Sequence, residues 1–165
     1  MNPNNYSLLA KIFHWGFVIL FVYGVAKQVE DITQLDNKIF FAFEIIFAIL
    51  FFCLLVIRFI YMQKTQKTSL PPDTPKVQKI AAKVVHFGMY ALLGIIATSG
   101  LLIGYLYSLE TVEGIIINLT IRIHEIAVNL LYIFIGVHIL AALFHRFKKD
   151  GVWDSMVPFL KEKSK

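Results

Sequence analysis

The chain contains five histidines, and each lies in or beside a long apolar stretch. They are His14, His86, His124, His138 and His145. An ionisable side chain is costly inside a membrane helix, so histidines in such segments usually carry function. His124 and His138 lie about four helical turns apart, which is about 21 Å of rise, and His145 follows about two turns later. All three share one helix face, and imidazoles at this separation suit the axial ligation of haem iron at two depths of a bilayer.

One pair of histidines stands out by depth. His14 lies early in the first apolar stretch and His138 late in the last one, so the two face each other at matched depth if the stretches are antiparallel helices. Gly16 and Gly136, each two positions away, would let a porphyrin pack close to the helices. Small residues also serve ordinary helix–helix packing. We therefore predict His14 and His138 as ligands, the alternative being hydrogen-bonded buried histidines.

Other polar residues in the apolar stretches have two interpretations each. Arg58 is a candidate partner for the haem propionates, or an interfacial anchor. His124, beside Arg122 and Glu125, is a haem ligand or a solvated residue at a helix end. His145 has a functional role or reaches the lipid headgroups.

The elements that must position these residues are four apolar segments, expected at 8–26, 39–62, 84–109 and 123–147. The chain is 58% hydrophobic and only 16% charged, which is too apolar for a soluble domain. Each segment reaches the roughly 20 residues that span a bilayer, and backbone groups in lipid must be paired internally. We therefore predict an all-α, antiparallel, integral membrane four-helix bundle that forms a single domain over residues 1–165.

Charge predicts the orientation of this bundle. All but three of the 16 basic residues, namely Lys27, Lys38 and Arg122, fall on one side of the predicted membrane, and cytoplasmic loops are rich in such residues. Both termini are then cytoplasmic, in a multi-pass protein of the bacterial inner membrane whose first helix is retained. The basic residues form no aromatic-interleaved patch, so nucleic acid is not an expected partner. The single cysteine, Cys53, excludes an internal disulfide and a c-type haem motif.

Short motifs in all four segments resemble one known family. They are Lys11-Ile12-Phe13-His14-Trp15, Val56-Ile57-Arg58, His86-Phe87-Gly88-Met89-Tyr90, and a last pattern from His124-Glu125 through Gly136-Val137-His138 to His145, followed by Lys149-Asp150-Gly151 and Met156-Val157-Pro158. Over nearly its whole length the chain resembles bacterial cytochrome b561, including its superoxide oxidase branch. It is also similar to the cytochrome b subunits of membrane-bound hydrogenases and formate dehydrogenases.

The resemblance implies haem b as the cofactor and assigns its ligands. The inner haem would be held by His14 and His138, and an outer haem by His124 and a histidine of the second helix. This chain has no histidine in that helix, and Glu44 stands at the expected position. Three hypotheses are open for the outer site: a haem on His124 alone or with an unusual partner, an empty site, or a polar Glu44–His124 contact. One haem b is therefore expected, and the second is left open.

The resemblance also implies a membrane quinone near His86 and His145, with Tyr90 one turn after His86 as a further hydrogen-bonding group. Neutral imidazoles near the inner aqueous face can supply the protons that quinone reduction requires.

We therefore predict a b-type cytochrome that transfers electrons through haem to or from membrane quinone. Whether it is an enzyme is left open: it would be a superoxide:quinone oxidoreductase, or an electron-transfer anchor subunit for a separate dehydrogenase or hydrogenase. Its partners would be quinone, the lipid bilayer and, in the second case, a redox partner protein. A haem-free transporter or proton-relay protein that uses Glu44 and the histidines is a further alternative.

Overall fold

The computed structural model describes residues 6–27, 29, 32–65 and 68–162. Its elements are α1 (Leu8–Ala26), the 3-10 helix η1 (Ile32–Asp36), α2 (Lys38–Thr65), α3 (Lys76–Ser108), α4 (Ile115–Lys148) and α5 (Val152–Met156). Among the described residues, four helices, α1 to α4, are long and apolar enough to span a membrane. The predicted all-α architecture with four apolar helices is therefore confirmed.

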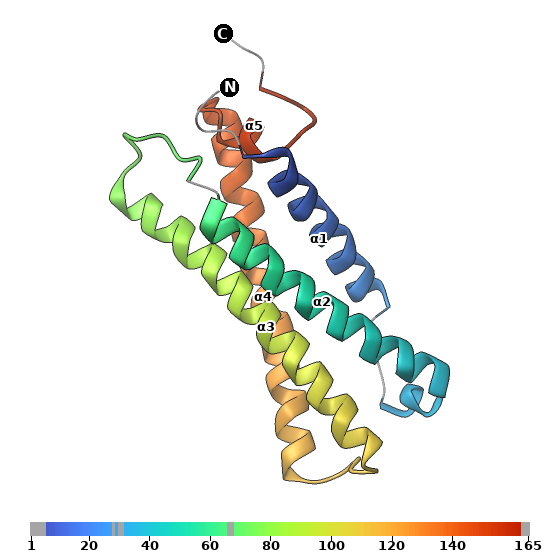
Figure 1. The fold of residues 1–165 in the computed structure, drawn as a ribbon. Coiled ribbons are helices and arrows are strands. Elements are labelled where there is room, and N and C mark those ends of the chain that lie inside the picture. The colour runs from blue at the N-terminus through green and yellow to red at the C-terminus, as the bar shows by residue number, and fades with distance from the viewer. Residues whose placement is uncertain (1–5, 28, 30–31, 66–67, 163–165) are drawn as a thin grey trace.

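The four long helices run in alternating directions, and neighbours in sequence are neighbours in space. Figure 1 shows α2 beside α1 and α3, with α4 behind, and it places the start of α1 at the same end as α5. We call the half with the start of α1, the end of α2, the start of α3 and the end of α4 the near half. The far half holds η1 and the turn between α3 and α4.

Three of the predicted helices are longer than their apolar cores. We expected the third and fourth helices to begin at Val84 and Ile123, but α3 begins at Lys76 and α4 at Ile115, while α2 continues past Met62 to Thr65. Prediction from the apolar run missed these ends because backbone hydrogen bonding continues through polar residues. At 33 and 34 residues, α3 and α4 are about 50 Å long, more than the roughly 30 Å of hydrocarbon.

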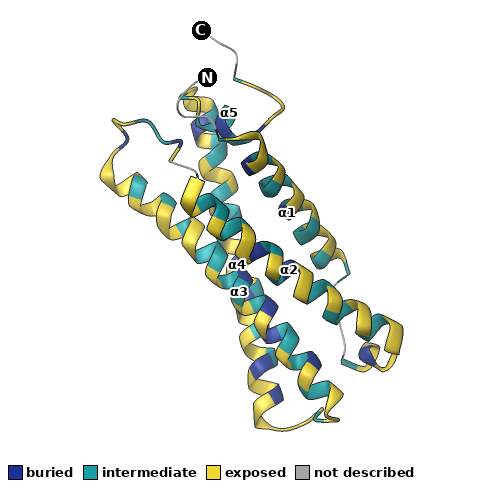
Figure 2. Ribbon diagram, in the orientation of Figure 1, coloured by how far each residue is buried: buried dark blue, intermediate teal, exposed yellow. Residues whose placement is uncertain are grey.

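The outer surface of the bundle is apolar. Large hydrophobic side chains such as Ile19, Ile46, Ile133 and Leu140 are exposed, and Figure 2 shows exposed residues along all four long helices. The buried core is small and includes Phe17, Phe51, Leu55, Leu93, Ala97 and Leu131. A surface of this kind is stable against lipid rather than water.

Close packing between α3 and α4 depends on a glycine. A Cβ on Gly88 would overlap the ring of Phe134, whereas a Cβ on Gly94 would meet nothing within 4 Å. Both positions lie inside α3, so alanine adds the same helix propensity at each, about 1 kcal/mol. The difference between the two variants therefore reports packing alone.

We expect Gly88→Ala to be less stable than Gly94→Ala by about 1–3 kcal/mol, the usual cost of overpacking. In thermal unfolding of the detergent-solubilised protein, the Gly88→Ala midpoint should lie roughly 2–10 °C below that of Gly94→Ala. Equal midpoints would show that Phe134 moves aside without cost, and that this glycine does not determine the α3–α4 contact.

Candidate functional site

Each of the four long helices contributes one polar side chain to a cluster in the near half. The ring centroids of His14 on α1 and His138 on α4 are 6.3 Å apart, with their planes tilted by 58°. The ring of His86 on α3 stands edge-on to His138, at 5.0 Å between centroids. Arg58 on α2 places Nη2 3.1 Å from Nδ1 of His14. We call these four residues the near cluster.

Local contacts set the register of α1 in this cluster. Ser7 caps the N-terminus of α1 by accepting a hydrogen bond from the amide of Ala10. The Ser7 hydroxyl also lies 2.9 Å from the hydroxyl of Tyr61, near the end of α2. Because α1 and α2 are antiparallel and meet here, His14 lies about two turns and Arg58 about one turn from this contact, and the long Arg58 side chain reaches the His14 ring.

The C-terminal segment holds the same end of α1. The Trp15 indole donates to the carbonyl of Met156 at 3.2 Å, and Lys11 Nζ donates to the carbonyl of Asp154 at 3.3 Å. The Trp15 ring also lies 4.9 Å from that of Phe159. The residues next to His14 are thus fixed by α5 and by the residues that follow it.

The groups predicted to line a quinone site are only partly brought together. His86 belongs to the near cluster, is exposed at the bundle surface, and donates from Nδ1 to the carbonyl of Ala82 at 2.6 Å. Tyr90 lies under Arg58, with 5.3 Å between its ring centroid and Cζ. His145 is buried at the end of α4, and its hydrogen-bonding partner is Asp150 rather than a residue of the near cluster.

The His145–Asp150 pair closes the end of α4. Nδ1 of His145 lies 2.7 Å from Oδ2 of Asp150, and Lys148 Nζ is 3.4 Å from the same oxygen. Partial burial raises the pKa of Asp150, but hydrogen bonds from His145, the Val152 amide and Lys148 outweigh it and hold that pKa below its ordinary value. Asp150 therefore remains an anion at neutral pH, and its contacts give His145 a structural partner.

In the far half, the two residues left open by the sequence have separate partners. Glu44 forms an ion pair with Lys27, at the end of α1. His124 lies nine residues inside α4 rather than at its start, and its Nδ1 is 2.9 Å from the Ser99 hydroxyl of α3. The described hydrogen bonds therefore join each of them to a different helix, and not to each other.

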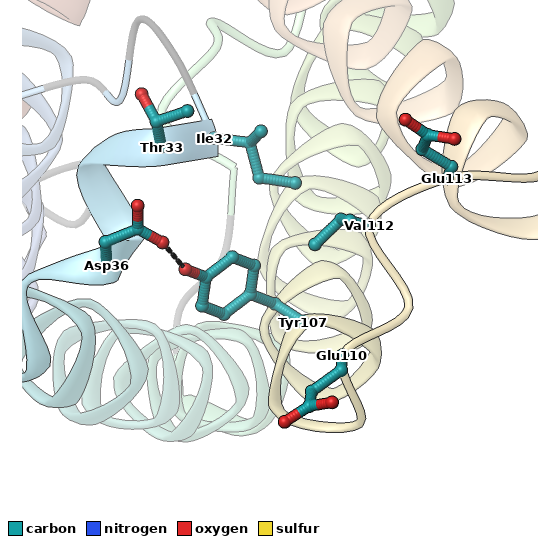
Figure 3. Close-up of a pocket in the computed structure, with 7 residues that line it drawn as sticks. All are labelled: Ile32, Thr33, Asp36, Tyr107, Glu110, Val112 and Glu113. Atoms are coloured by element: carbon teal, nitrogen blue, oxygen red, sulfur yellow. Dashed lines mark hydrogen bonds between the residues drawn. The ribbon is translucent and has the colours of Figure 1, made fainter.

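A shallow pocket of about 450 Å³ lies at the far end, away from the near cluster. It is lined by Ile32, Thr33, Asp36, Tyr107, Glu110, Val112 and Glu113. Figure 3 shows the Tyr107 hydroxyl donating to Asp36 across it. Sequence analysis missed this pocket because its residues come from η1, the end of α3 and the following turn, with no common motif.

Comparison with protein families identifies the chain. The model of the family described as prokaryotic cytochrome b561 matches residues 5–159. The chain belongs to the prokaryotic cytochrome b561 family. Searches of curated proteins and of solved structures gave no match. The sequence-based resemblance is thus confirmed, and the chain is a multi-pass membrane cytochrome of a family that generally transfers electrons through haem b.

The near cluster meets the requirements of the haem b that cytochrome b561 membership implies. A metal–imidazole bond is about 2 Å long, so two imidazoles on one iron have centroids about 6 Å apart, close to the separation of His14 and His138. Beside them, a Cβ on Gly16 or Gly136 would meet nothing within 4 Å. Nε of Arg58 is buried without a hydrogen-bond partner in the described chain, as expected of a donor that awaits a carboxylate.

Arg58 and a haem iron would compete for His14. A guanidinium only donates hydrogen bonds, so its contact with Nδ1 makes that nitrogen an acceptor and leaves the ring proton on Nε2. A neutral imidazole that binds iron through Nε2 carries its proton on Nδ1 instead. Ligation through Nε2 would therefore exclude the Arg58–His14 hydrogen bond and leave the guanidinium available to the haem carboxylates.

Proposed function

We propose that the chain is a b-type cytochrome of the bacterial cytoplasmic membrane, exchanging electrons between a haem b on His14 and His138 and a membrane quinone. The observation that carries this proposal is the facing pair of imidazoles at 6.3 Å, with a half-buried guanidinium beside them. The family match over residues 5–159 supports the cofactor.

Both chain termini are proposed to be cytoplasmic. The start of α1 and α5 lie at one end of the bundle, and that end carries Arg146, Lys148 and Lys149. Clusters of lysine and arginine beside membrane helices mark the cytoplasmic side. Three other basic residues of the same argument, Lys67, Lys163 and Lys165, lie outside the described part of the chain.

The side chains around the cofactor have separate proposed roles. When bound, haem b supplies a one-electron iron couple. His14 and His138 hold it between α1 and α4, and Arg58 offsets its carboxylates. Reduction of a quinone takes up two electrons, delivered singly by a donor, and two protons, which the protein must supply.

His86 is the proposed proton-exchanging group at the quinone: its neutral ring accepts a proton from quinol at Nε2 and, once protonated from the aqueous side, donates one to quinone. Its Nδ1 is committed to the carbonyl of Ala82, so Nε2 is the nitrogen that exchanges protons. Its exposure at the bundle surface makes it accessible from the membrane, where quinone dissolves. Tyr90 is the proposed hydrogen-bonding neighbour. His145 offers only Nε2 to the same site, because its Nδ1 is bonded to Asp150.

The test is reduction of the haem by a short-chain quinol, followed by absorbance in a stopped-flow instrument. We expect rapid reduction of the wild type. His86→Phe should bind the same amount of haem but react at least about tenfold more slowly, because positioned acids and bases contribute about 10²-fold or more. Tyr105→Phe, in the exposed far part of α3, is the control and should react like the wild type.

Each outcome answers a separate question. A wild-type haem that no quinol reduces would contradict the quinone proposal. Equal rates in the wild type and His86→Phe would contradict only the role of His86. If quinol fails and a soluble dehydrogenase or superoxide reduces the haem, the alternatives expected from the resemblance apply instead. A colourless purified protein would favour the haem-free transporter.

A further inference from the structure

The far half offers a single imidazole. His14, His86 and His138 gather in the near half, and His145 is bonded at the end of α4, which leaves His124. Among the described sulfur-bearing residues, Cys53 lies near the middle of α2 with an exposed side chain, and the methionines lie in the near half. Met62 and Met156 lie at near-half ends of their helices, and Met89 is one turn from His86. A six-coordinate haem needs two such ligands, so the far half lacks one of them.

His124 is satisfied without a metal. The Ser99 hydroxyl is 2.5 Å from the carbonyl of Ile95, so it donates there and accepts from Nδ1–H of His124 at 2.9 Å. The imidazole also lies against α3 at Gly100, where a Cβ would be 3.4 Å from its Cε1. The ring is thus packed in the contact between α3 and α4, with Nε2 as its one remaining ligand atom.

Two charged groups of the far half, at the end of α1 and on α2, form an ion pair. Lys27 and Glu44 are in close contact, and their side chains are only 14% and 20% exposed. The Lys27 ammonium also lies 4.3 Å from the centroid of Phe47 and 5.4 Å from that of Phe43. The Lys27 ammonium is therefore already paired with Glu44 and is not available to a haem carboxylate. By contrast, Nε of Arg58 has no hydrogen-bond partner in the described chain.

Close packing of α2 on α3 continues at the same end. A Cβ on Gly104 would overlap Ile45, the residue next to Glu44, and would lie 3.6 Å from the ring of Phe41. Between α1 and α2, a Cβ on Gly24 would lie 3.4 Å from the ring of Phe47. Gly24, Gly100 and Gly104 in the far halves of their helices thus have side chains against them, whereas a Cβ on Gly16 or Gly136 beside the near cluster would meet nothing within 4 Å.

We infer that the far half holds no second haem, because it offers one imidazole and its Lys27 ammonium is already paired with Glu44, so that electrons enter and leave through the near half alone. This inference rests on the proposed haem at His14 and His138. With one centre in one half of the bilayer, the donor and the quinone must both approach that half. The chain is then a one-sided electron carrier and does not conduct electrons across the membrane.

Haem content distinguishes this inference from the proposed function. The full-length protein is purified in detergent, titrated with hemin to saturation, freed of excess, and analysed for haem per polypeptide by pyridine haemochrome. We expect a ratio of one in the wild type and in His124→Ala, and less than about a tenth of that in His14→Ala. A ratio of two, or loss of half the haem in His124→Ala, would overturn the inference. No haem in the wild type would overturn the proposed function.

A second measurement covers the case in which His124→Ala does not fold. Redox titration of the wild type, monitored by absorbance, should follow one one-electron component, and the Lys27→Met/Glu44→Gln double variant should do the same. Two components in the wild type would show a second centre and contradict the inference without use of any His124 variant.

Discussion

Replacing His138 by alanine is expected to remove the haem, lowering haem per polypeptide by at least about tenfold after saturation with hemin. The physical reason is that the two ligands come from different helices. His14 alone leaves one axial bond, and a buried haem with one protein bond is held mainly by apolar contact. The measurement is the pyridine haemochrome ratio, together with the reduced-minus-oxidised spectrum.

Chemical rescue separates ligation from folding in this experiment. His138→Gly leaves space where the imidazole stood, so added imidazole should restore most of the bound haem and the low-spin spectrum of two nitrogen ligands. The matched control is Tyr132→Phe, at an exposed position of α4. This variant should bind haem like the wild type. Full haem content in His138→Ala would remove this residue from the ligand set and direct attention to His86, whose ring is its neighbour.

Replacing Arg58 by glutamine is expected to lower the midpoint potential of the haem by about 70 mV. A positive charge favours the reduced iron, which is the less positive state. At about 10 Å and an effective dielectric constant of about 20, its Coulomb energy is about 1.7 kcal/mol. For one electron, about 60 mV corresponds to a tenfold change in the equilibrium. The measurement is a redox titration of the purified protein.

Arg58→Lys is the matched control for this prediction. Lysine retains the charge, so the potential should stay near the wild-type value, although a single ammonium cannot form two parallel bonds to a carboxylate. If glutamine and lysine lower the potential equally, geometry rather than charge determines the effect. An unchanged potential in Arg58→Gln would show that the guanidinium does not lie near the haem, and that its place beside His14 belongs to the protein without cofactor.

The spans could be predicted because the bilayer imposes a strong constraint on composition. Twenty apolar residues in a row admit few structures other than a membrane helix. The helix ends were harder to predict, because nothing in the apolar pattern marks how far a helix continues into water. The error mattered at His124, which sequence placed at a helix start and which the structure places well inside α4, against Ser99.

The sequence predicted contacts of the candidate site only where they follow from the depth of the residues in the membrane. His14 and His138 lie at matched depth on antiparallel helices, and their rings do face each other. Depth says nothing about rotation of a helix, however, so it did not predict that Glu44 pairs with Lys27 on α1 while His124 bonds to Ser99 on α3. Nor did it predict that Arg58 hydrogen-bonds His14, since that bond depends on one rotamer of a long side chain.

The contact between Trp15 and Met156 joins positions 141 residues apart, at the two ends of the chain. Since α1 is synthesised before α4 and α5, the facing of His14 with His138 can form only after α4 has entered the bilayer, and the Trp15–Met156 contact only after α5 has been made. On the proposed ligation, haem binding would follow the insertion of α4. A product that stops before α4 would then remain an apoprotein, and haem colour in a cell extract would report only chains that include this helix.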